Sequence, residues 1–150
     1  MAGGVFNLGM EPSTIEGWCT LATRGCATAR TLIGAKHSTD AWAQAGFAVE
    51  CALKASIMAH QRFNRWPSKD LRPDLYTHDL RHLAREAGLD FRSLIRDPIA
   101  PHFQTALLWR RTEGYNPNAM PMRVAEDMVK SACGPSGVVQ WLATRYRLTI

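Results

Sequence analysis

The sequence predicts an all-α fold, and three observations lead to this prediction. Alanines recur from Ala41 to Ala59 at spacings of four, three, four, three and four residues, which places them on one face of a helix. Further segments repeat apolar residues at helical spacing between breaks that contain proline or glycine. No stretch alternates like a strand, apart from a weak tail at residues 148–150. We therefore expect a bundle of four or five helices.

The first helix is expected from about residue 14 to residue 36, and the second from the turn at 38–40 to about residue 62. Ser13 is a candidate N-cap, and Glu16 three residues later completes a capping box. The turn at 38–40 also supplies the cap of the second helix. The alanines permit close approach, and a second face of this helix is bulky and apolar, so we expect it to be the central helix. The bulky residues are Trp42, Val49, Leu53 and Ile57, with Phe47 beside them.

Glu50 and Lys54 lie four residues apart on the second helix, in the order that favours an ion pair. One interpretation is a surface ion pair that contributes about 0.2–0.5 kcal/mol. The other interpretation places Glu50 opposite the start of the third helix.

A polar loop of about 14 residues follows Arg62, and Trp66 is expected to anchor it partially. The third helix is short, begins near residues 77–79 and ends with Gly88 as its C-cap. Its outward face carries Arg81 and Arg85. Its inward face carries Leu80, Leu83, Ala84 and Ala87.

Two further helical segments are expected after an irregular stretch at residues 90–101. Pro101 is placed to open a helix that ends near Arg111. Helical spacing resumes at residues 122–132, is broken or kinked at residues 134–137, and closes with residues 138–146.

Composition favours one domain, residues 13–147, behind a flexible N-terminus at residues 1–12. The chain has 150 residues, of which 46% are hydrophobic, and this suits one compact core. The four cysteines form no C-x-x-C pair, so buried free thiols are expected rather than disulfides or metal ligands. No segment approaches the ~18 apolar residues of a membrane span, and the N-terminus has no basic n-region. We expect a cytoplasmic protein without a membrane contact, a metal or a cofactor.

The positive charge is unevenly distributed. Residues 1–60 contain four basic and four acidic residues, whereas residues 62–111 contain ten basic and six acidic residues. The formal net charge is +5. This asymmetry favours a polyanionic partner such as nucleic acid or a phosphorylated ligand, with an ordinary solvated face as the alternative.

Two motifs stand out on the second helix and at the start of the third. One is the run from Ala48 to Ala55, which contains Glu50 and Lys54, and the other is His78-Asp79-Leu80-x-x-Leu83, followed by Ala87-Gly88-Leu89. Together they resemble the motifs of the HEPN family. The resemblance implies a four- to five-helix up-and-down bundle, usually a homodimer, in cytoplasmic proteins that act on nucleotides or RNA. Many members of the family pair with a small nucleotidyltransferase. Others are metal-independent ribonucleases of toxin-antitoxin, abortive-infection or defence systems.

The nuclease members of that family rely on Arg-x4–6-His, and this chain departs from the pattern. An imidazole can take the 2′-hydroxyl proton of RNA while a guanidinium holds the phosphate. Arg110 and Arg111 stand at the corresponding place, but no histidine follows them at that spacing. The same spacing occurs at Arg96 and His102, which are the best-placed catalytic candidates. It also occurs at Arg30 and His37 and at Arg72 and His78.

The expected function is therefore a homodimeric HEPN-like module that binds nucleotide or nucleic acid, with a nucleotidyltransferase as a further candidate partner. A metal-independent ribonuclease toxin or defence protein is one alternative, and a non-catalytic protein-interaction subunit is another. The start of the third helix and the turn after Arg111 are expected to form one basic rim, with Tyr115 as a stacking surface for a base. The candidate binding residues are His78, Asp79, Arg81, Arg85, Arg110, Arg111 and Tyr115. The structural alternative for Asp79 is a helix N-cap.

Overall fold

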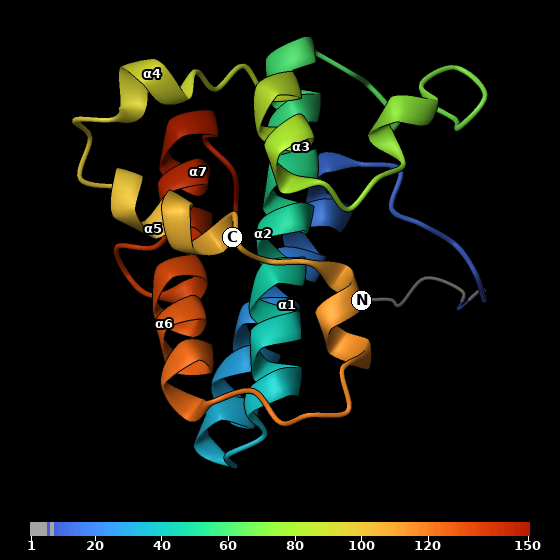
Figure 1. Ribbon diagram of the computed structural model, residues 1–150. Coiled ribbons are helices and arrows are strands. Elements are labelled where there is room, and N and C mark those ends of the chain that lie inside the picture. Colours follow the sequence, from blue (N-terminus) through green and yellow to red (C-terminus); the bar gives the residue numbers. More distant parts are fainter. Residues whose placement is uncertain (1–5, 7) are drawn as a thin grey trace.

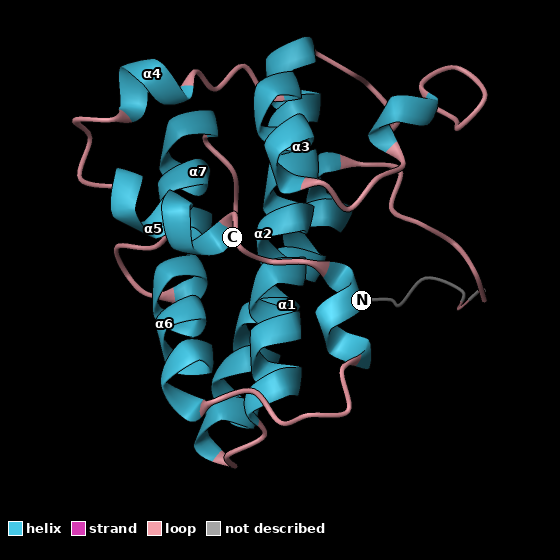
Figure 2. Ribbon diagram, in the orientation of Figure 1, coloured by secondary structure: helices cyan, strands magenta, loops and turns pink. Residues whose placement is uncertain are grey.

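The computed structural model describes residue 6 and residues 8–150, and its regular elements are all helices (Figure 1). Figure 2 shows helices and loops only, and within the described residues the tail at 148–150 is not a strand. The all-α prediction is confirmed. Of the expected N-terminal segment, residues 1–5 and 7 lie outside the described residues.

The N-terminal half is an antiparallel hairpin of two long helices, α1 (Ile15–Gly34) and α2 (Ser38–Gln61) (Figure 1). The cap of α1 is Thr14 rather than Ser13, because the Thr14 hydroxyl accepts a hydrogen bond from the Gly17 amide at 3.0 Å. The predicted capping box of Ser13 and Glu16 is therefore wrong. Ser13 instead accepts a hydrogen bond at its carbonyl from the Trp66 amide at 2.8 Å, which ties it to the long loop.

The start of α2 also differs from the prediction. The helix already includes Ser38, and His37 occupies the cap position without a side-chain hydrogen bond. The Ser38 hydroxyl donates to the Met120 carbonyl at 2.6 Å, and the Thr39 hydroxyl accepts from the Met120 amide at 3.0 Å. The two hydroxyls thus bind the segment before the later helices instead of capping their own helix.

Helix α2 is the centre of the bundle, as its alanines predict. Ala41, Ala45, Ala48, Ala52 and Ala55 are completely buried. The helix is contacted by α1, by α3 (Leu80–Glu86) and by two later helices, α6 (Met122–Cys133) and α7 (Val138–Tyr146). A Cβ placed on Gly25 of α1 would lie 3.0 Å from the Ala48 Cβ, which shows how closely the two backbones approach.

The segment between α2 and α6 contains only short helices. They are η1 (Pro73–Leu75), α3 (Leu80–Glu86), α4 (Phe91–Leu94), α5 (Ala100–Ala106) and η2 (Arg111–Tyr115). The expected helix from Pro101 to about Arg111 is too long, because α5 ends at Ala106 and a turn follows. This turn directs Trp109 into the core, where its ring lies 6.4 Å from that of Trp42.

Helices α6 and α7 follow one another along the same side of the bundle (Figure 1). Residues 134–137 between them are not helical, so this segment separates two helices rather than kinking one. A Cβ on Gly134 would lie 2.5 Å from the Lys130 carbonyl oxygen, which explains the small residue at this point.

The four cysteines are buried and free, as predicted. In the described part of the chain, no helix combines the length and the apolar character that crossing a membrane requires.

Candidate functional site

The start of α3 is built by Asp79, which caps the helix. Its carboxylate accepts hydrogen bonds from the amides of Arg81 at 3.0 Å and His82 at 3.3 Å. The Thr77 hydroxyl accepts from the Asp79 amide at 3.1 Å and fixes the preceding turn. Asp79 therefore has the structural role of an N-cap, which complements the positive end of the helix. Capping also sets the direction in which His78 and Arg81 leave the backbone.

The structure places six of the seven predicted binding residues around one hollow, which we call the arginine cleft. Its volume is about 510 Å³. Arg85 does not line it and instead borders a separate hollow beside Gly88 and Phe91. The arginine cleft is lined by Thr77, His78, Asp79, Arg81, Trp109, Arg110, Arg111, Thr112 and Tyr115.

The charges around the cleft are mostly positive. Arg110 donates from Nη1 to the carbonyls of Leu107 at 3.0 Å and Trp109 at 2.9 Å, so it is held by the backbone rather than by an acid. Within residues 8–150, neither Arg81 nor Arg111 forms an ion pair through its side chain. The only carboxylate of the lining belongs to Asp79, which is engaged with the helix amides. The cleft therefore attracts anions.

A buried chain of charged groups ends at His78. The Nδ1 atom of His78 lies 2.7 Å from Glu50 Oε1, and Glu50 Oε2 lies 3.1 Å from Lys54 Nζ. Glu50 is 2% exposed and Lys54 is 4% exposed. The predicted surface ion pair is therefore wrong, and the interpretation in which Glu50 faces the start of the third helix is confirmed.

Two tryptophans make the burial of Lys54 tolerable. Its ammonium lies 4.9 Å from the ring centroid of Trp18 and 5.8 Å from that of Trp66. Such contacts compensate in part for the lost hydration of the charge. Trp66 belongs to the long loop, so this loop is anchored on the core, as predicted, and covers the buried charges.

The Glu50 contact fixes the orientation of the His78 ring. Because Glu50 is paired with Lys54, we assign it as an ionised carboxylate, which only accepts hydrogen bonds, and the proton of this contact is then assigned to Nδ1 of His78. The Nε2 atom is then unprotonated whenever the ring is neutral, and it lies on the opposite edge of the ring. The side chain of His78 is 49% exposed and lines the cleft. An imidazole held in this way can accept a proton or a hydrogen bond from a bound molecule.

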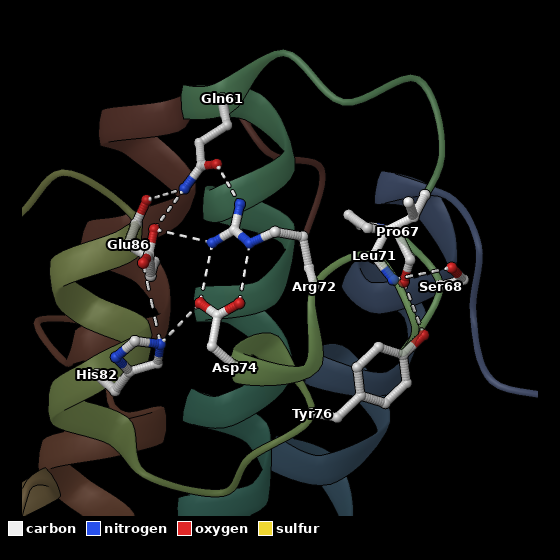
Figure 3. A network of polar contacts seen from close by, with 9 residues as sticks. All are labelled: Gln61, Pro67, Ser68, Leu71, Arg72, Asp74, Tyr76, His82 and Glu86. Atoms are coloured by element: carbon white, nitrogen blue, oxygen red, sulfur yellow. Dashed lines mark hydrogen bonds and ion pairs between the residues drawn. The ribbon is translucent and has the colours of Figure 1, made fainter.

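Arg72 holds the long loop onto α3 through a polar network (Figure 3). Its Nε atom lies 2.9 Å from Asp74 Oδ1, and its Nη2 atom lies 3.3 Å from Glu86 Oε2. His82 Nε2 contacts Asp74 Oδ2 at 3.1 Å. The Arg72 guanidinium lowers the pKa of Asp74 far below its usual range, and the Asp74 carboxylate raises the pKa of Arg72.

This network contains the ligand types of a metal site, since Asp74, His82 and Glu86 present their ligand atoms within 4.8 Å of one another. The Arg72 guanidinium already binds two of the three residues. A metal ion would have to displace it. Arg72 is thereby committed to the loop and does not form a catalytic pair with His78.

The structure does not unite Arg96 and His102. The Nδ1 atom of His102 forms a hydrogen bond with the Ser131 hydroxyl at 3.0 Å. The same residue lines a hollow beside Asp97 and Trp141. Arg96 is exposed and does not line this hollow. The spacing of Arg30 and His37 is equally uninformative, because Arg30 donates to the Cys133 carbonyl at 2.6 Å.

Trp109 forms one wall of the cleft. From the sequence, this residue is expected in the helix that ends near Arg111. A Cβ on Gly46 would lie only 2.0 Å from Trp109 Cδ1, so the indole rests directly on the backbone of α2. A glycine in the middle of a long helix is the signal that could have indicated such a close contact.

Comparisons of the chain with protein-family models, with curated proteins and with solved structures give no match.

Proposed function

We propose that the arginine cleft binds the phosphate groups of a nucleotide or of single-stranded nucleic acid. The observation that carries this proposal is the meeting of Arg81, Arg110 and Arg111 in one hollow with Tyr115. Guanidinium groups suit phosphate because they present several donors in a fixed fork. Tyr115 is 74% exposed, so its ring is available for stacking on a base.

On this proposal the chain is a HEPN-like binding module, and the expected homodimer and nucleotidyltransferase partner remain predictions that come from the resemblance. The two motifs behind the resemblance meet at the cleft, since Glu50 lies on one and His78 on the other, at 2.7 Å from each other. The expected cytoplasmic location likewise stays a prediction.

A second candidate function is metal-independent RNA cleavage, and the contact between Glu50 and His78 favours it. In this reaction the 2′-oxygen attacks the adjacent phosphorus, a 2′-O–P bond forms and the P–O5′ bond breaks. His78 Nε2 takes the 2′-hydroxyl proton, and the O5′ leaving group receives a proton from the imidazolium or from water. Arg81 and Arg111 would stabilise the charge on the phosphate. His78 thus replaces His102 as the candidate base.

The test is the retention and integrity of a labelled single-stranded RNA incubated with the protein in EDTA. Arg81→Ala with Arg111→Ala should weaken binding at least tenfold and reduce the slope of log affinity against log salt by about 1–2. Arg24→Ala with Arg123→Ala is the matched control, because both residues are exposed and neither lines the cleft. Arg30 is unsuitable as a control, since it bonds the Cys133 carbonyl.

The outcomes separate the three functions. Salt-sensitive retention of intact RNA supports the binding module, and cleavage that His78→Gln abolishes supports the ribonuclease. Equal losses of RNA affinity in both double variants would mean that the RNA responds only to the overall positive charge of the protein and not to the arginine cleft. If the RNA is neither retained nor cleaved at low salt, both proposals are overturned and the non-catalytic interaction subunit is the function that remains.

A further inference from the structure

A second hollow adjoins the arginine cleft on the other side of η2. Its volume is about 350 Å³. The two hollows share Trp109, Arg111 and Tyr115, so these residues stand between them. The rest of the second hollow is formed by Gly114 and by one face of α2, which contributes Asp40, Ala43, Gln44 and Phe47.

The face of α2 in this hollow carries two polar side chains that the fold itself does not use. Asp40 and Gln44 are four residues apart, so they lie one above the other on successive turns. Among the described residues, neither side chain forms a hydrogen bond or an ion pair within the protein. Phe47 beside them is half-buried and supplies an apolar wall.

We propose that the second hollow is a guanine subsite, in which Asp40 and Gln44 bind the Watson–Crick edge of the base. This inference rests on the proposed binding of nucleotides in the arginine cleft. Guanine presents one acceptor, O6, followed by two donors, N1–H and the 2-amino group. Gln44 can donate its amide to O6, and the two oxygens of Asp40 can accept from N1–H and the 2-amino group.

The other bases match this pair of side chains less well. A carboxylate accepts two hydrogen bonds best from two adjacent donors, and only guanine among the four bases has two donors side by side on this edge. Adenine and cytosine each place one donor beside an acceptor, and uracil places one donor between two acceptors. An acceptor opposite the Asp40 carboxylate is repelled.

The position of Arg111 links the subsite to the arginine cleft. Because Arg111 lines both hollows, a phosphate bound there has room for a base on either side. Tyr115 also lines both hollows, and its exposed ring can stack on a base in either of them. The predicted ligand is therefore a guanosine phosphate, free or within a single strand.

The test measures the affinity of four labelled hexaribonucleotides, one all-uridine and three with a single guanosine, adenosine or cytidine at the third position. The parent protein should bind the guanosine hexamer about tenfold more tightly than the other three. Asp40→Asn should abolish this preference, so that the guanosine hexamer binds no more tightly than the all-uridine hexamer in the same variant. Asp127→Asn, an exposed change of the same charge on α6, should keep the preference.

The failure of this inference differs from the failure of the proposed function. Salt-dependent binding of all four hexamers with equal affinity, or a guanosine preference that survives Asp40→Asn, overturns the guanine subsite alone. If none of the four hexamers binds at low salt, both the guanine subsite and the proposed function of the arginine cleft are overturned.

Discussion

Glu50 is the residue that joins the core of the protein to its candidate site. One carboxylate oxygen contacts His78 at 2.7 Å and the other contacts Lys54 at 3.1 Å, in a position that is 2% exposed. Burying a charge is costly unless opposite charges and hydrogen bonds compensate for the lost hydration. Here the compensation is mutual, so each of the two buried charges depends on the other.

Replacing Glu50 by glutamine should therefore be strongly destabilising. Glu50→Gln leaves the Lys54 ammonium buried without a counter-charge, and the expected loss is about 3–5 kcal/mol in the free energy of unfolding. Urea denaturation measures it. The double variant Glu50→Leu with Lys54→Met should recover most of the loss, because it removes both charges. A single variant within 1 kcal/mol of the parent would show that the pair is hydrated.

The sequence shows the spacing of Glu50 and Lys54 but not their burial. The spacing of four residues is typical of an exposed ion pair, and it is equally compatible with a buried one. What buries the pair is Trp66, which lies in the loop after the helix and covers Lys54 together with Trp18. Such a tertiary contact is not visible in local spacing.

At the scale of elements, the packing of α1 on α2 depends on small residues. Ala48 is completely buried opposite Gly25, where even an added methyl group would lie at 3.0 Å. Interiors this dense leave no room for a larger side chain.

Enlarging Ala48 should therefore separate the two helices. Ala48→Leu is expected to lower the free energy of unfolding by about 1–3 kcal/mol, because it overpacks the contact. The matched control is Ala27→Leu on the exposed face of α1, which should change little. Thermal denaturation of both variants measures the difference. Identical melts would contradict the central position of α2.

The loop between α2 and α3 depends on an ion pair that acid can remove. Because Arg72 holds the pKa of Asp74 far below its usual range, the ionised carboxyl stabilises the folded state. This contribution is complete above the unfolded pKa of about 3.9, and it is lost as pH falls below that value. The side chains are 30% and 38% exposed, so solvent screening keeps the contribution modest.

Arg72→Ala should accordingly reduce the acid sensitivity of the protein. The melting temperature of the parent should fall more steeply than that of Arg72→Ala as pH is lowered from about 4 to 2. Arg92→Ala removes the same charge from an exposed position without an ion pair in the described residues, and it should follow the parent. Parallel curves for all three proteins would show that Asp74 ionises independently of Arg72.

Helix positions were predictable from apolar spacing, whereas their ends depend on distant contacts. The long helices and the break at residues 134–137 lie where the spacing predicts them. Ser13, Ser38 and Thr39 have the side chains of helix caps. The Ser13 carbonyl instead bonds the Trp66 amide, and the hydroxyls of Ser38 and Thr39 bond the backbone of Met120. The end of α5 at Ala106 likewise follows from the burial of Trp109 against Gly46.

For the molecule as a whole, the sequence indicated the cleft because its residues cluster at two helix ends. Six of the seven candidate residues line it, while Arg85 is one turn further along α3 and faces elsewhere. The second hollow was not predictable, since Asp40 and Gln44 lie far from η2 in sequence and meet it only through the fold.

Most of the apolar surface of α2 is already buried within a single chain, which leaves little of it for the expected dimer. Large apolar side chains are exposed elsewhere, including Ile95 at 71% and Leu108 at 69%. We expect these to be covered by a twofold partner, which gives a mass of twice 16.7 kDa. Light scattering at micromolar concentration measures this mass. A value near 16.7 kDa would contradict the prediction.

The reactivity of the four buried cysteines reports on local unfolding of the protein. Burial raises the pKa of Cys51 well above its usual range, and the nearby Glu50 carboxylate raises it further, so Cys51 offers a thiol reagent almost no thiolate while the core is intact. Any modification has to pass through a state in which helices separate. Cys26 on α1 and Cys133 on α6 report on the outer contact of the bundle, and Cys51 reports on its centre. Their relative labelling rates would show which part of the bundle opens first, without any introduced probe.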